Sequence, residues 1–70
     1  MLDEKHIFIL LKESLKNYTN NLEKNDFNYM EYKGEIIAYL KVLNRPDIQN
    51  KFKYLDINKA KELLEYIENI

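Results

Sequence analysis

Apolar residues recur at helical spacing through the first third of the chain. They stand three or four positions apart at Ile7, Leu11, Leu15, Tyr18 and Leu22. Residues with this spacing lie along one side of an α-helix, which completes a turn every 3.6 residues. Asp3 and Glu4 lie near the start of this segment, where the helix dipole favours negative charge. The pattern predicts a helix over residues 3–22, ended by the polar stretch that follows it.

A second helix is predicted over residues 28–43, and it carries two apolar faces. One arc of roughly 100° holds six apolar or aromatic residues on a helical wheel: Tyr29, Tyr32, Ile36, Tyr39, Leu40 and Leu43. The opposite arc holds Phe27, Met30, Ile37 and Ala38, with Gly34 between them. One apolar face is enough for a helical hairpin. The second helix therefore either lies between the other two or keeps one face for a partner.

The last part of the chain predicts a third helix over residues 57–69, because Asp56 is a good N-cap and an apolar face follows it. Pro46 favours a short helical turn before it, near the first position of that turn. The first two helices are joined by a short loop and should pack antiparallel. We expect an all-α protein, a single domain over residues 1–70 with three helices built on an antiparallel helical hairpin.

Small and apolar residues outside the main stripes indicate a second contact surface. Gly34 costs a helix about 1 kcal/mol relative to alanine, and it lies one turn before Ala38 on the same face. Such a pair allows another backbone to approach closely, either from the same chain or from a second copy in a dimer. The third explanation is that the glycine is a tolerated accident without a structural role. Leu2 and Ile9 lie opposite the main stripe of the first helix. We expect a homo-oligomer, with a dimer favoured, whose contacts are Ile9, Met30, Gly34, Ile37 and Ala38.

Length and composition support association as a source of stability. The chain has 70 residues, no cysteine and one histidine, which excludes disulfides, thiolate zinc sites and multi-histidine metal sites. A core this small leaves little net stability, so a partner subunit is the remaining stabilising device. The apolar run over residues 7–11 is too short for a signal peptide or a membrane span. We expect no metal, no cofactor, no membrane association and a cytoplasmic location.

Catalytic chemistry is not indicated by any motif. His6 has no serine, cysteine or acid at a motif-like spacing. Glu31 and Glu35 lie one turn apart, and carboxylates do acid–base work only where burial perturbs them. A solvated strip between the two apolar faces is the expected role of this pair. We therefore expect that the protein is not an enzyme.

Tyrosines and basic residues are the candidate binding groups. Tyrosine suits protein interfaces because it buries a rigid ring and keeps a polar tip, and it also stacks on bases. Residues 41–61 hold six basic residues against two acidic ones, which favours an anionic partner. The single arginine argues against sequence-specific DNA recognition. The expected partner or ligand contacts are Tyr29, Tyr32, Tyr39, Arg45, Lys51 and Lys53.

Ten lysines against one arginine, with abundant Asn, Ile and Tyr, resemble the composition of small accessory proteins of bacteriophages and mobile elements in low-GC bacteria. The resemblance implies a host cytoplasm. The expected function is non-enzymatic: docking on a host or partner protein and modulating or inhibiting it, as an inhibitor of a host defence does. One alternative is an oligomer that sequesters a nucleotide or another anionic small molecule. Another is a purely structural helical oligomer.

Overall fold

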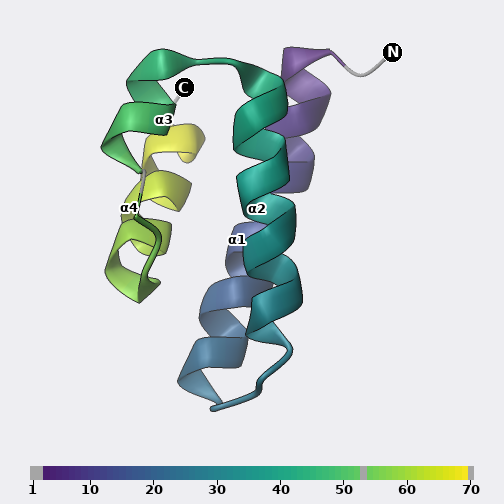
Figure 1. The fold of residues 1–70 in the computed structure, drawn as a ribbon, viewed down its shortest axis with the longest axis vertical. Coiled ribbons are helices and arrows are strands. Elements are labelled where there is room, and N and C mark those ends of the chain that lie inside the picture. The colour runs from purple at the N-terminus through teal and green to yellow at the C-terminus, as the bar shows by residue number, and fades with distance from the viewer. Residues whose placement is uncertain (1–2, 53, 70) are drawn as a thin grey trace.

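The computed structural model describes residues 3–52 and 54–69, and these contain four α-helices and no strand (Figure 1). Their bounds are α1 (Glu4–Glu23), α2 (Tyr29–Leu43), α3 (Pro46–Lys51) and α4 (Ile57–Glu68). The all-α class is confirmed. The three long helices begin and end within one residue of the expected positions, and α3 forms at the expected helical turn. Leu2 and Lys53, which entered the sequence interpretation, lie outside the described residues.

Helices α1 and α2 form an antiparallel hairpin and lie side by side along most of their length (Figure 1). The turn between them depends on Asn25, whose φ of 56° is left-handed. Asparagine tolerates this conformation better than most residues that carry a Cβ. The Asp26 side chain then accepts a hydrogen bond of 3.0 Å from the backbone N–H of Asn28. The polar stretch therefore reverses the chain through its own local hydrogen bonds.

The second half of the chain turns back at Asn44, which ends α2 with a left-handed φ of 51°. Pro46 begins α3, because its missing N–H is not needed in a first helical turn. Asp56 caps α4 by accepting a hydrogen bond of 2.8 Å from the backbone N–H of Lys59. Helix α4 packs against α1, and α3, which follows the end of α2, lies on the same side of the hairpin as α4 (Figure 1). The central helix is therefore α1, and α2 is not sandwiched between the other two long helices.

The core draws side chains from all four helices. Its largest fully buried members are Leu11, Leu15, Ile36, Ile48 and Leu63. The inner face of α2 is the one that carries Ile36 and Leu40, with the tyrosines of the same arc packed around them. Of the two apolar faces of α2, the one with Ile36 and Leu40 therefore packs into the core. The other face is left without cover in the described chain.

Candidate protein interaction surface

Exposed apolar residues gather on the side of α2 that faces away from α1. Phe27, just before the helix, is 82% exposed, Met30 is 65% exposed and Val42 is 62% exposed. Ile37 and the small residues Gly34 and Ala38 are also exposed on this side. The outer α2 face, as we use the term, consists of Phe27, Met30, Gly34, Ile37, Ala38 and Val42. It extends along the full length of α2.

Gly34 lies in the middle of the outer α2 face, and the fold does not require it. A Cβ added at this position would meet nothing within 4 Å. Its φ is not positive, so the backbone conformation does not demand glycine either. A tight crossing with another described helix of the same chain, one of the three explanations for this glycine, is therefore wrong. The described chain leaves the space above Gly34 open to another molecule.

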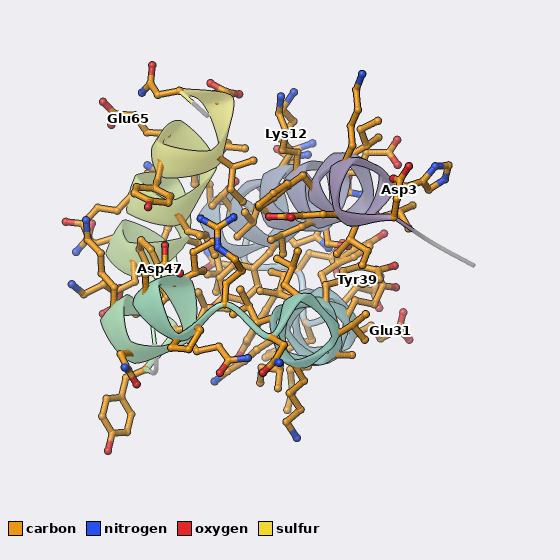
Figure 2. All side chains as sticks on the ribbon, turned by 90° about the horizontal axis from the view of Figure 1, so that it is seen from above. Asp3, Lys12, Glu31, Tyr39, Asp47 and Glu65 are labelled. Carbon is orange, nitrogen blue, oxygen red and sulfur yellow. The ribbon has the colours of Figure 1, made fainter. Side chains whose placement is uncertain are left out.

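Ile9 is exposed as expected but lies on a different surface. Its side chain is 52% exposed, and it lines a shallow groove with Phe8, Lys12 of α1 and Ile67 of α4. Lys12 points away from α2 (Figure 2). The five residues expected to form one oligomer contact therefore belong to two surfaces. Met30, Gly34, Ile37 and Ala38 share the outer α2 face, whereas Ile9 belongs to the groove between α1 and α4.

The three candidate tyrosines of α2 lie on its inner side. Tyr29, Tyr32 and Tyr39 are half-buried and pack against the core, and Tyr39 lies between α1 and α2 (Figure 2). The Tyr29 ring meets that of Tyr18 edge-on, with 6.1 Å between ring centroids. Burial, with smaller contributions from Asp56 and Tyr29, raises the pKa of the Tyr18 hydroxyl. The tyrosines therefore hold the hairpin together, and their role as partner contacts stays a prediction.

Two of the candidate basic residues, Arg45 and Lys51, are engaged within the chain. The Arg45 guanidinium forms ion pairs with Glu4, at the start of α1, and with Asp47, at 3.2 Å. Hydrogen bonding to Arg45 lowers the pKa of the Asp47 carboxyl. The Lys51 ammonium lies over two aromatic rings, 5.6 Å from the Phe52 centroid and 5.3 Å from the Tyr66 centroid. Lys53 lies outside the described residues.

Among the described residues, Lys51 and Tyr29 line different grooves, and Tyr29 lies beside Leu22 and Phe27. A groove beside Lys51 is lined by Glu62, Glu65, Tyr66 and Asn69. Two carboxylates and one ammonium make this groove unfavourable for a phosphate. Sequestration of a nucleotide therefore stays a prediction, and the groove beside Lys51 does not support it.

One polar contact across the hairpin was not foreseen. The Ser14 hydroxyl donates a hydrogen bond of 2.8 Å to a carboxylate oxygen of Glu35, and Ser14 is the only buried polar residue among those described. Glu35 is thus tied to α1 and is not simply a member of a solvated strip. The signal was present in the sequence, because Ser14 falls inside the apolar stripe of the first helix. A buried hydroxyl at such a position needs a partner.

Metal and membrane chemistry are likewise not indicated by the described residues. Among them, no group of three or more His, Cys, Asp or Glu side chains is placed to hold a metal ion. None of the described helices combines the length and the apolar character that crossing a bilayer requires. His6 is exposed at the first turn of α1, where its backbone N–H bonds to the Asp3 cap at 2.8 Å.

Comparisons with protein family models, with curated proteins and with solved structures found no match to this chain. The functional interpretation therefore depends on the geometry of the chain itself. The most distinctive feature of the described chain is the outer α2 face.

Proposed function

We propose that this protein is a non-enzymatic interaction protein, and that it acts by binding another protein chain through the outer α2 face. The observation that carries the proposal is the exposure of Phe27, Met30, Ile37 and Val42 along one side of a single helix. Soluble monomers seldom expose apolar residues in one continuous patch, and such patches mark interaction sites. A partner helix or sheet would remove these side chains from water.

The energetic gain from covering this face is substantial for a small protein. Full burial of a side chain such as Met, Ile, Phe or Val contributes about 1.5–3 kcal/mol relative to full exposure. Three residues of the face are more than half exposed in the single chain. A partner that covered them would therefore gain most of this burial free energy. Gly34 and Ala38 add no bulk at the centre, so a partner backbone meets little obstruction there. Glu31 and Lys33 stand beside the face as a polar rim, an arrangement common at interfaces.

The composition favours a phage or mobile-element origin for this protein. A chain encoded by a phage or mobile element would meet its partner in the cytoplasm of the host, where a bound host protein would be modulated or inhibited. The proposal needs no catalytic residue, metal or cofactor, because the effect follows from occupying a surface in stoichiometric amounts.

Site-specific photo-crosslinking tests the proposal directly. A photoreactive phenylalanine replaces Ile37 on the outer α2 face, and the matched control carries it at Asn58, an exposed position on α4. We expect crosslinks from position 37 to a defined protein chain, and Met30→Asp in the same chain should remove them. Equal labelling from positions 37 and 58, both in the purified protein and in host extract, would overturn the proposal.

A further inference from the structure

We propose that the chain that occupies the outer α2 face is a second copy of this protein, whose α2 lies antiparallel across the first. This inference rests on the proposed function, because it names the partner of the same surface. It is carried by two observations: the apolar residues exposed along α2, and the placement of opposite charges at its two ends. Glu31 lies in the first turn of α2 and Lys41 in the last turn.

The charges distinguish the two symmetric ways in which the helices could pair. In a parallel dimer each residue lies level with its own copy, so Glu31 meets a carboxylate and Lys41 meets an ammonium. In an antiparallel dimer with its two-fold axis at the level of Ile36, Glu31 lies level with Lys41 of the partner subunit. The same relation repeats on the other side of the axis. Only the antiparallel pairing is therefore complementary in charge.

Both charged groups are available for such a pairing. Glu31 and Lys41 are exposed, and neither takes part in an ion pair or side-chain hydrogen bond within the part of the chain that the structure describes. Glu31 points away from the rest of the molecule (Figure 2). Intersubunit pairing would therefore break no salt bridge that the fold uses.

The shape of the face fits the same axis. Gly34 and Ala38 lie equally far before and after Ile36 in the sequence. Met30 and Val42 form a second such pair, further from Ile36. At the centre, each small residue then lies level with the other small residue of the partner subunit, so the helix axes can approach closely. Towards the ends, Met30 lies level with Val42 of the partner subunit, and both are more than 60% exposed in the single chain. A self-complementary patch of this kind is what a two-fold dimer requires.

A charge-swap series measured by sedimentation equilibrium at low ionic strength tests the inference. We expect the wild-type chain to dimerise. Glu31→Lys and Lys41→Glu should each weaken the dimer by roughly three- to thirtyfold, since each swap replaces two attractive pairs by repulsive ones. The double variant Glu31→Lys/Lys41→Glu should recover the wild-type dissociation constant. In a parallel dimer the single swaps would leave the dissociation constant unchanged, which would overturn the antiparallel arrangement.

A second pair of variants tests the close approach without unfolding the chain. Gly34→Leu should abolish the dimer because its side chain fills the crossing, whereas Gly34→Ala should retain it. Neither side chain meets a neighbour in the single chain near its Cβ, so circular dichroism should show folded protein in both cases. A Gly34→Leu variant that dimerises as well as wild type would overturn the inference.

The failure of this inference is separable from the failure of the proposed function. A wild-type chain that stays monomeric at every soluble concentration overturns the second copy as occupant. The proposed function survives that result if position 37 still crosslinks to a different protein. A dimer that persists in Met30→Asp, with no crosslink from position 37, overturns both.

Discussion

The fold of a single chain does not explain why glycine stands at position 34. Glycine in the middle of a helix lowers its stability by about 1 kcal/mol relative to alanine. Neither a positive φ nor a close neighbour requires glycine at this position. The cost is therefore not offset within the described chain.

Replacing Gly34 with alanine should stabilise the monomer. We expect Gly34→Ala to raise the free energy of unfolding by about 0.5–1 kcal/mol, because alanine restricts the unfolded chain and its Cβ meets no neighbour. Urea denaturation at a dilution where the chain is monomeric measures the change. Ala38→Gly, one turn further along the same face, should lower stability by a similar amount. A destabilised Gly34→Ala monomer would show that another part of the chain contacts this position.

Tyr18 gives a second prediction at the residue scale. Burial, with Asp56 and Tyr29 adding to it, raises the pKa of its hydroxyl in the folded chain above the ordinary value of 10.0. The neutral hydroxyl is thus favoured by folding. This contribution to stability is fully present below pH 10 and is lost as the pH rises through that value towards the folded pKa.

Alkaline titration followed by tyrosinate absorbance should show this group ionising later than free tyrosine. Tyr18→Phe removes the ionisation, so the variant should lose less stability than wild type as the pH is raised. An unchanged alkaline titration curve in the variant would contradict the assignment to Tyr18.

At the scale of elements, the helices differ in how they begin. Asp3 and Asp56 each accept a hydrogen bond of 2.8 Å from a backbone N–H in the first turn of α1 and α4. Helix α2 begins without such a side-chain bond. Helix α4 has no acidic residue in its first turn and no basic residue in its last, so its dipole is not compensated by charges within those turns. The Asp56 cap is therefore the main local stabilising interaction at the start of α4.

Removing this cap should destabilise the protein measurably. We expect Asp56→Ala to lower the free energy of unfolding by about 1 kcal/mol, the usual value for a lost N-cap. Asp56→Asn is the matched control, because its side-chain oxygen still accepts the hydrogen bond. Urea denaturation of both variants separates the capping effect from a general effect of the charge. Equal losses in the two variants would mean that the carboxylate charge matters and the cap does not.

At the scale of the whole molecule, α1 connects the two halves of the fold. It packs against α2 on one side and α4 on another. Leu11 and Leu15 are fully buried in the shared core. The loss of one of these side chains therefore affects both the hairpin and the attachment of α4.

A large-to-small change at this point should unfold a considerable fraction of the protein. Leu15→Ala is expected to cost about 2–5 kcal/mol, which is a large share of the stability of so small a domain. The exposed Val42→Ala is the control and should change the stability of the monomer by less than about 0.5 kcal/mol. Thermal unfolding at a monomeric concentration compares them. A cooperative Leu15→Ala transition near the wild-type melting temperature would contradict the core assignment.

The sequence by itself determined the helices and their ends, because these depend on neighbours within a few positions. Apolar spacing defined α1 and α4, Asp56 marked the start of α4, and Pro46 marked the short helix α3. The short polar turn was enough to make α1 and α2 antiparallel. The sequence also predicted that α2 has two apolar faces, and it identified most residues of the outer α2 face.

Only the tertiary structure decided which face of α2 is internal and which helix is central. Spacing could not choose, since both arcs of α2 are apolar and either would cover α1. The structure packs the arc that carries Ile36 and Leu40 against the core, and Tyr29, Tyr32 and Tyr39 lie half-buried around it. The pairing of Arg45 with Glu4 was equally hidden, since the two residues lie far apart along the chain. Contacts between distant segments depend on the combined packing of all four helices, and no local pattern encodes them.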